Sequence, residues 1–253
     1  MQKRVLYLLL WLVLPIMSFG NNDATGVFEK GNSLYAKGQY KEALDCYKQL
    51  LDKGYESATV YYNMGNASYK MDDMPSAILY FEKAHKLAPT DEDINFNIRL
   101  TNLKITDKIE EIPEFFLTRW WKASILLFSV ETLSVISIIF FLAGSALLIL
   151  YFFANGFLVK KYAFYASLAT FLIGIATIFA GNRQLNYFDN HHQAIVFSSS
   201  VTVKSGPVDK STTLFVIHDG TKVNVEDNNN DWIKIKLTNG NEGWIKASDV
   251  KEI

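Results

Sequence analysis

The sequence predicts a multidomain membrane protein made of an all-α array of helical-hairpin repeats, a transmembrane helical hairpin and a small all-β barrel. Three observations predict this fold class. A pattern repeated after 34 residues occupies the first third of the 253-residue chain, two long uncharged runs follow, and apolar residues alternate with polar ones near the C-terminus. The 26 acidic and 25 basic side chains nearly cancel, so the basic excess needed to bind nucleic acid is missing. We therefore expect no nucleic acid among the partners.

Residues 1–20 have the form of a secretory signal peptide. Lys3 and Arg4 precede an apolar core, and the small residues Ser18 and Gly20 predict cleavage after Gly20. A permanent anchor is the alternative, but crossing a bilayer of about 30 Å takes about 20 helical residues, and this core is shorter. An exported N-terminus predicts that two later spans return the C-terminus to the same side of the membrane.

Residues 21–112 contain two copies of one pattern. Gly31 and Gly65 are small residues that let two antiparallel helices approach closely, while Tyr47 and Phe81 fill the space behind them. The pattern resembles the tetratricopeptide repeat family over roughly residues 24–91. The matching positions are Gly31, Tyr40, Ala43, Tyr47, Gly65, Ala77, Phe81, Ala84 and Pro89.

A capping helix is expected to close this array. Thr90 together with Asp93 predicts its N-cap. Four isoleucines then follow at spacings close to one helical face: Ile94, Ile98, Ile105 and Ile109. Elsewhere in the array, the single cysteine, Cys46, has no second cysteine to pair with, and its position predicts a small packed hydrophobe rather than a nucleophile.

The resemblance implies a concave groove lined by the first helix of each repeat. Family members hold the backbone of an extended peptide there with asparagines, and its terminal carboxylate with Lys or Arg. Asn32 and Asn63 match the asparagines, whereas the cationic positions hold Phe28, Asp93 and Asn97. Backbone or apolar contacts are therefore expected from Phe28, Asn32, Asn63, Asn66 and Asn97. The alternative is that these asparagines only cap and solvate the helices.

Residues 113–128 predict an interfacial helix, and residues 129–181 predict two membrane spans. Residues 132–159 and 162–182 carry no charge, with only Lys160 and Lys161 between the two runs. Tryptophans and cations that suit the headgroup level of a membrane lie just upstream, at Arg119, Trp120, Trp121 and Lys122.

Two further details of the spans follow from local sequence. Ser129 is expected to cap the first span, with Glu131 in its first turn, where the helix dipole favours an anion. On the second span, Ala166, Thr170 and Gly174 recur every four residues and predict close packing against another helix. That helix is either the first span or part of another protein.

A polar linker over residues 182–199 is expected to lead into a small β-barrel over residues 200–253. Alternating apolar residues predict the strands: Val201, Val203, Leu214, Val216, Val223, Val225, Ile233, Ile235 and Leu237. The stretch from "DGTKVNV" to "GWI" resembles a bacterial SH3-like domain. Because Ile233 and Ile235 face one way, a partner-binding surface is expected on the other side, at Trp232, Lys234 and Lys236.

The resemblance leaves the ligand of this domain open. Trp232 aligns with the tryptophan that lines the groove of proline-binding members, but Lys246 and Asp249 replace the expected proline and tyrosine. Recognition of proline-rich peptides is therefore not expected. A wall peptide, a protein surface or a purely structural role of Trp232 remain as alternatives.

The sequence predicts no catalytic or metal centre. Asp189, His191 and His192 lie together, but two adjacent histidines do not easily face one ion and no third strong ligand is near in sequence. A phosphate loop, a nucleophile motif and an HExxH motif are all missing. We therefore expect a protein that is not an enzyme and has no cofactor.

The order of the modules resembles the BatE-like proteins of the Bacteroides aerotolerance operon. That resemblance implies an inner-membrane protein with periplasmic terminal domains, von Willebrand factor A-domain membrane proteins and a MoxR-type ATPase as neighbours, and a role in oxidative or envelope stress tolerance. The expected function is a scaffold or adaptor that binds partner proteins through the groove and the SH3-like domain. The alternatives are a peptidoglycan-binding anchor or sensor, and a membrane-bound hydrolase, for which the sequence offers no acid, base or metal set.

Overall fold

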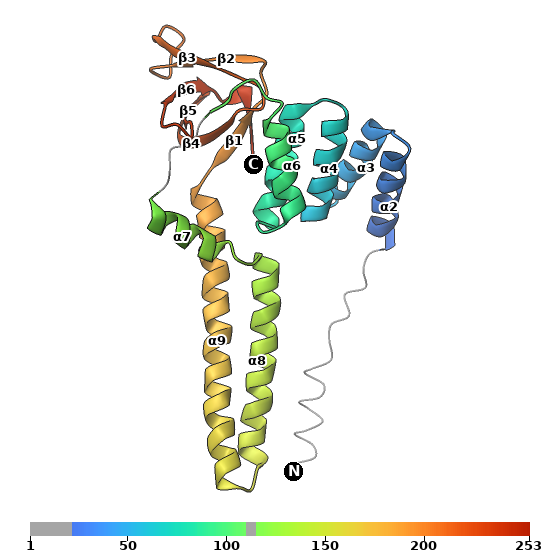
Figure 1. Cartoon of the computed structure of the whole chain (residues 1–253), viewed down its shortest axis with the longest axis vertical. Helices are drawn as coiled ribbons and strands as arrows, with labels where there is room; N and C mark the ends of the chain where they lie inside the picture. The colour runs from blue at the N-terminus through green and yellow to red at the C-terminus, as the bar shows by residue number, and fades with distance from the viewer. Residues whose placement is uncertain (1–21, 110–114) are drawn as a thin grey trace.

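The computed structural model describes residues 22–109 and 115–253, so the expected signal peptide lies outside the described residues. A group of short helices lies beside a β-sheet domain, and two long helices extend away from both (Figure 1). This arrangement confirms the predicted multidomain fold class. We call the short helices and the sheet together the head.

Five helices form the repeat domain: α2 (Asn22–Ala36), α3 (Tyr40–Asp52), α4 (Ala58–Lys70), α5 (Met74–Leu87) and α6 (Glu92–Asn102). The two predicted glycine–aromatic contacts hold these helices together. A Cβ on Gly31 would lie 2.6 Å from the ring of Tyr47. One on Gly65 would lie 2.5 Å from the ring of Phe81. Both rings are almost fully buried, so each glycine permits a close helix–helix approach that any side chain would prevent. Cys46 is also buried, as predicted.

The N-cap of α6 differs from the prediction. Asp91 caps the helix, because its Oδ1 accepts hydrogen bonds from the backbone amides of Asp93 at 3.0 Å and Ile94 at 3.1 Å. Thr90 lies one residue too early, and the Asp93 amide donates to the cap. A carboxylate at this position also interacts favourably with the helix dipole.

The capping helix is also shorter than its isoleucine spacing predicted. It ends at Asn102, so Ile105 and Ile109 lie beyond it. Ile105 packs instead against a buried cluster that α5 and the sheet share, and Ile109 packs against the core of the sheet domain. Burial against a second domain therefore takes the place of helix continuation in this segment.

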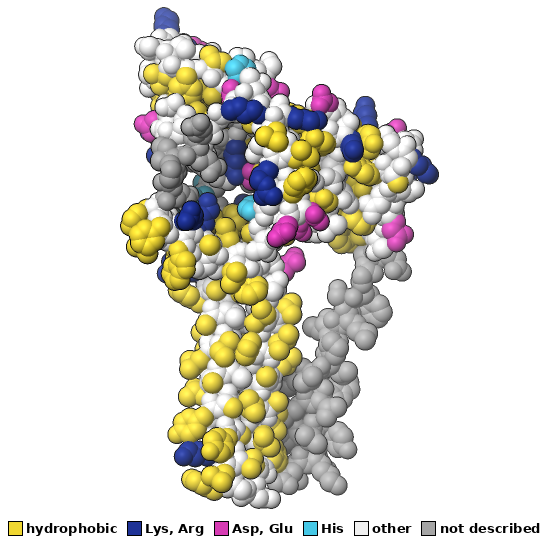
Figure 2. All heavy atoms as spheres, in the orientation of Figure 1, with side chains coloured by type: hydrophobic (Ala, Val, Ile, Leu, Met, Phe, Trp, Pro, Cys, Tyr) yellow, Lys and Arg dark blue, Asp and Glu magenta, His cyan; other side chains and the backbone are white. Residues whose placement is uncertain are grey.

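The two long helices are α8 (Val130–Phe153) and α9 (Phe157–Asn190), and we call this pair the stem. The short helix α7 (Phe116–Ile125) precedes them, and we call it the collar helix. By length and composition, α8 and α9 are each suited to cross a membrane. Apolar side chains cover the visible face of this pair (Figure 2). Ser129 caps α8 as predicted, since its Oγ accepts the backbone amide of Thr132 at 3.2 Å, and Glu131 lies in the first turn.

The small-residue face of α9 packs against α8. A Cβ on Gly144 of α8 would lie 2.9 Å from Thr170 Oγ1 of α9. A Cβ on Gly174 of α9 would lie 2.9 Å from the ring of Phe141 of α8. Ser167 Oγ donates to the Gly144 carbonyl at 2.9 Å. Ala166 is exposed, so Ser167 takes the place that the predicted four-residue stripe gave to Ala166.

Seven strands form one antiparallel sheet in the order β3-β2-β6-β5-β4-β1-β7. They are β1 (Gln193–Val196), β2 (Ser200–Lys204), β3 (Thr213–His218), β4 (Lys222–Asn229), β5 (Trp232–Lys236), β6 (Glu242–Lys246) and β7 (Val250–Glu252). A short 3-10 helix, η1 (Ala247–Asp249), precedes β7. The linker expected over residues 182–199 is instead mostly ordered structure, because α9 continues to Asn190 and β1 pairs with β4 and β7.

The inner face of strand β3 is the opposite of the one predicted, which was the face that carries Leu214 and Val216. Leu214 and Val216 are 49% and 45% exposed, whereas Ile217 is buried. Pairing with β2 sets this orientation, because the register places Ile217 opposite Val201 and Phe215 opposite Val203. Both faces of this strand are apolar, so alternation alone could not assign its inner face.

The sheet domain packs against α5 and against residues 103–109. Ile78 and Leu79 of α5 form a buried cluster with Ile195 of β1. Gly220 has a φ of +82° and lies so close to this cluster that a Cβ there would meet Ile105 Cγ2 at 2.6 Å. The β3–β4 turn therefore needs glycine both for its backbone conformation and for contact with the repeat domain.

Candidate interaction surfaces

The four asparagines expected in the groove form two pairs across neighbouring helices. Asn63 Nδ2 on α4 donates to Asn32 Oδ1 on α2 at 3.1 Å. Asn97 Nδ2 on α6 donates to Asn66 Oδ1 on α4 at 3.0 Å. Tyr47 Oη supports the first pair by donating to Asn32 Oδ1 at 2.8 Å, and burial raises the pKa of Tyr47 to about 12, so its hydroxyl keeps its proton at neutral pH. We call these two contacts the asparagine pairs.

Each asparagine pair leaves one amide donor and one acceptor available. Within residues 22–109 and 115–253, Nδ2 of Asn32 and Asn66 and Oδ1 of Asn63 and Asn97 have no hydrogen-bond partner. None of the four residues lies at a helix end, which argues against a capping role. A peptide backbone offers one carbonyl and one amide per residue, so each pair matches the polar groups of one extended residue.

An aromatic row runs beside the asparagine pairs, and of its three members only Phe28 was predicted from the sequence to make contacts. Phe28, Tyr62 and Phe96 are related by the 34-residue period. The ring centroid of Phe28 lies 6.0 Å from that of Tyr47, and the ring centroid of Tyr62 lies 5.9 Å from that of Phe81. Phe96 is 56% exposed. Tyr62 Oη accepts a hydrogen bond from Asn97 Nδ2 at 3.2 Å, which places the row next to the second pair. The spacing that identified the glycines could have identified this row.

The structure places Trp232, Lys234 and Lys236 on the outer face of β5, and both lysines are ion-paired there. Lys234 Nζ lies 3.1 Å from Glu242 Oε2 and 3.4 Å from Glu226 Oε2, and Lys236 Nζ lies 3.5 Å from Glu226 Oε1. The hydrogen bond to Glu242 raises the pKa of Lys234. An incoming ligand would therefore have to compete with these carboxylates for either lysine.

Trp244 is a second candidate on this outer face. The strand register places it between Lys204 of β2 and Lys234 of β5. Trp232 makes a cation–π contact with Lys246, whose Nζ lies 5.7 Å from the centroid of its ring. Trp244 was not predicted from the sequence, although the alternation in "EGWIK", with Gly243 and Ile245 facing inward, could have identified it as an outward residue.

The four residues expected at a membrane interface all lie on α7, the collar helix. No residue of α7 is buried, and Trp120 and Trp121 are among its most exposed side chains. The helix lies across the end of α9 that is closest to the head (Figure 1). Arg119 is exposed, whereas Lys122 is partly covered and lines a cavity beneath the head.

The adjacent histidines His191 and His192 contact different residues. His191 Nδ1 donates to the Tyr187 carbonyl at 2.7 Å, and His192 Nδ1 lies 3.0 Å from Glu252 Oε1. Across the part of the chain that the structure describes, no group of three or more His, Cys, Asp or Glu side chains is arranged to hold a metal ion.

Comparison with protein families assigns both head modules. The "TPR repeat" family matches residues 31–72, the "Tetratricopeptide repeat" family matches residues 58–91, and the "Bacterial SH3 domain" family matches residues 199–251. The chain therefore carries tetratricopeptide repeats and a bacterial SH3 domain. Modules of these two classes typically bind proteins or peptidoglycan and are typically non-catalytic.

Two solved structures are similar to parts of this chain. A TPR repeats protein from Bacteroides fragilis is 15% identical over 67% of this chain and 79% of that one, with a TM-score of 0.30. An NlpC/P60 family protein from Bacillus cereus is 17% identical, with a TM-score of 0.22. That match covers 28% of this chain and only 23% of the length of the Bacillus protein. No curated protein matches the sequence.

Proposed function

We propose that the chain is a non-enzymatic, membrane-anchored scaffold whose repeat groove binds an extended segment of a partner protein. The asparagine pairs carry this proposal, because each presents an unused donor beside an unused acceptor on neighbouring helices. The exposed ring of Phe96 adds apolar area beside them. Such a surface matches a peptide backbone with an apolar side chain, and no lysine or arginine stands at the cationic positions to bind a free carboxylate.

Anchoring by α8 and α9 supports the scaffold role. A soluble protein rarely exposes large continuous apolar areas, and this pair exposes apolar side chains along its whole visible face (Figure 2). Because both helices join the head at one end, the repeats and the SH3 domain lie on the same side of the proposed membrane (Figure 1). We place that side in the periplasm, with Lys160 and Lys161 on the cytoplasmic side.

The module order supports a more specific proposal about partners. Its resemblance to the BatE-like proteins favours other inner-membrane proteins, including those with von Willebrand factor A domains, and a role in oxidative or envelope stress tolerance. Protease digestion of spheroplasts tests the orientation first. We expect cleavage within both head modules, and protection of both would contradict a periplasmic head.

Site-specific crosslinking tests the groove itself. A photoreactive phenylalanine analogue at Phe96 should crosslink a membrane partner in native cells, whereas the same probe at Lys41, exposed on α3, should not. Replacing Asn32 and Asn66 with alanine removes both unused donors. Since each neutral hydrogen bond contributes about 1 kcal/mol, losing two should weaken binding, and with it the crosslink, about thirtyfold. Equal crosslinking from both probe positions would count against the groove.

Peptidoglycan binding by the SH3 domain is the second candidate. Trp244 beside Lys234 offers an aromatic surface for a sugar ring, and a carboxylate of a wall peptide would take the place of Glu226 or Glu242 next to that lysine. Retention of the full-length protein on purified sacculi tests this function. Trp244→Ala should reduce retention and Trp121→Ala on the collar should not. No retention of the unaltered protein would eliminate this candidate.

A further inference from the structure

Strand β3 is an edge of the sheet that carries no Lys, Arg, Asp or Glu. It spans Thr213–His218, with the sequence "TLFVIH", and its one neighbour in the sheet is β2. The opposite edge, β7, is only three residues long and contains Lys251 and Glu252. Short, charged edge strands resist pairing with another chain, whereas a longer uncharged edge favours it. Of the two edges, β3 is therefore the one suited to accept a further strand.

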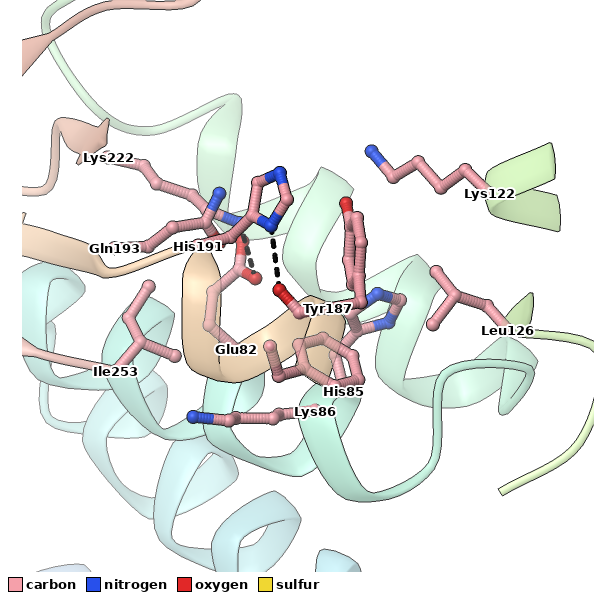
Figure 3. Close-up of a pocket in the computed structure, with 11 residues that line it drawn as sticks. Glu82, His85, Lys86, Lys122, Leu126, Tyr187, His191, Gln193, Lys222 and Ile253 are labelled. Carbon is pink, nitrogen blue, oxygen red and sulfur yellow. Dashed lines mark hydrogen bonds and ion pairs between the residues drawn. The ribbon is translucent and has the colours of Figure 1, made fainter. Parts of the chain in front are cut away.

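The repeat domain occupies a different part of the sheet. Lys222 at the start of β4 pairs with Glu82 of α5, and the two side chains point toward each other beside the cavity beneath the head (Figure 3). Ile195 of β1 is buried against the same helix. Strand β3 lies at the other end of the strand order, in the part of the head that is farthest from the stem (Figure 1). Neither α5 nor the proposed membrane therefore covers its edge.

Free backbone groups lie on this edge at Val216. In an antiparallel ladder, the amide and carbonyl of alternate residues point toward the neighbouring strand and away from it. The His218 amide points away from β2, because it donates to Asp107. Val216 lies two residues earlier in an unbroken register, so its amide and carbonyl also point outward. Within the part of the chain that the structure describes, no hydrogen bond reaches either group from outside the sheet.

The length of the free edge matches β3 itself. At one end, the Asp107 carboxylate already occupies the outward position at His218, so an added strand has to stop before that residue. At the other end, β3 begins at Thr213, shortly after a turn. An antiparallel strand therefore overlaps residues 213–217, with Phe215 at its centre. The exposed side chain of Val216 adds apolar contact area to the backbone hydrogen bonds.

Charge favours a second copy of this chain as the added strand. Antiparallel pairing centred on Phe215 brings the turn before β3 in one copy toward the turn after β3 in the other. The first turn carries Lys210, which is exposed and has no ion-pair partner among the described residues, and the second carries Asp219. Asp209, beside Lys210, is already paired with Lys246. Two contacts between opposite charges can therefore form about one two-fold axis.

We propose that two copies of this chain pair through antiparallel β3 strands and join their sheets into one. The backbone amide and carbonyl of Val216 in each copy find partners on the other copy. Anchoring in one membrane holds both strands at the same height and raises their effective concentration, so this step rests on the proposed membrane anchoring. The joined sheet presents two Trp244 rings on the same outer face, which gives a repetitive ligand two points of contact.

Cysteine crosslinking of the full-length protein in native membranes tests the pairing. Val216→Cys, in a Cys46→Ala background, places two thiols near the two-fold axis. Diagonal neighbours across an antiparallel pair are about 7–8 Å apart, so a short thiol-specific crosslinker should join two copies that carry different tags. Thr238→Cys is the matched control, because this residue is exposed in the same domain but lies outside β3. It should give no crosslinked dimer.

Charge variants test the same pairing through copurification of the two tagged copies from detergent extracts. Val216→Lys places two like charges beside the axis and should lower copurification about tenfold or more, whereas Thr238→Lys should not. Lys210→Glu should lower it about fivefold, because two surface ion pairs are lost. Adding Asp219→Lys to Lys210→Glu reverses both charges and should restore pairing. Because Val216 is on the surface, circular dichroism should show that Val216→Lys stays folded.

Three results would overturn the proposal. Equal crosslinking of Val216→Cys and Thr238→Cys would show that copies only collide at random. Crosslinking of Val216→Cys to a different protein alone would assign the edge to that protein. Unrestored pairing in Lys210→Glu/Asp219→Lys would contradict an antiparallel pair of β3 strands.

Membrane anchoring itself is measured separately. A membrane protein stays in the pellet after an alkaline carbonate wash, and loss of the chain to the supernatant would contradict the anchoring. If the chain stays in the pellet but gives no crosslinked dimer, only the pairing of β3 strands fails.

Discussion

Asp107 binds the β3–β4 turn through His218, which lies 111 residues later in the chain. Asp107 Oδ2 accepts the His218 backbone amide at 2.6 Å, and Oδ1 lies 2.9 Å from Nδ1 of the same histidine. Thr221 Oγ1 also donates to Oδ2, at 2.7 Å. One carboxylate from the repeat segment therefore organises a turn of the SH3 domain.

Removing this carboxylate should loosen the turn. Asp107→Ala leaves the amide of His218 and the hydroxyl of Thr221 without their acceptor, a loss of about 2–3 kcal/mol. Hydrogen exchange on the full-length protein should show amide exchange in residues 213–222 faster by a factor of about ten or more. The control Asp45→Asn, exposed on α3, should not change exchange. Unchanged protection in Asp107→Ala would mean that the contact contributes no stability.

The Asp107 contact should also depend on pH. Burial by itself would raise the pKa of Asp107, but the hydrogen bonds from Thr221 and His218 outweigh it and hold the pKa below its usual range. The folded pKa is thus below the unfolded value of about 3.9. The contact should stabilise the head fully above that value and lose its effect as pH falls through the folded pKa. Thermal unfolding followed from pH 7 to pH 3 should decline less steeply at its acidic end in Asp107→Asn.

His85 should give a separate pH dependence at higher pH. Burial lowers the pKa of His85; the nearby Glu82 carboxylate opposes this effect and the charge of Lys222 adds to it, and the pKa stays below its usual value. Because the unfolded chain binds the proton more readily, stability should begin to fall as pH drops below the unfolded pKa of about 6.5. His85→Gln should remove this part of the decline while Asp107→Asn leaves it in place. A decline in that range that persists in His85→Gln would assign it to another group.

The repeat glycines offer a direct packing test. Gly65→Ala places a methyl group against the buried ring of Phe81 and should destabilise the repeat domain by about 1–3 kcal/mol, and Gly31→Ala should do the same against Tyr47. Gly26→Ala, on the same helix as Gly31, meets nothing within 4 Å and should be neutral or slightly stabilising. Urea unfolding followed by circular dichroism measures all three. Equal effects at Gly26 and Gly31 would contradict close packing at Gly31.

A buried and an exposed lysine ion pair should contribute different amounts to the free energy of unfolding. Lys222→Met leaves Glu82, which is only 8% exposed, as a buried unpaired charge and should cost about 3 kcal/mol. Lys246→Met breaks an exposed pair with Asp209 and should cost less than about 1 kcal/mol. Chemical denaturation of the two variants compares them. Similar midpoints would mean that Glu82 finds water or another partner.

Much of the fold could be predicted because its signals are periodic and local. The 34-residue spacing predicted how Gly31 meets Tyr47 and how Gly65 meets Phe81, since equivalent residues in a repeat occupy equivalent places. Alternation likewise predicted that Ile233 and Ile235 face inward. Alternation failed in β3, where both faces are apolar and only pairing with β2 chooses between them.

The sequence by itself determined the modules, their order and the side chains available for contacts. Only the tertiary structure decided how the modules meet. Ile105 fitted a helical face by spacing, but its apolar surface is buried against α5 and β1 instead. Asp107 and Lys222 carry no local pattern, because each acts through a residue more than a hundred positions away in the chain. Such contacts depend on three-dimensional closeness, which a one-dimensional period does not encode.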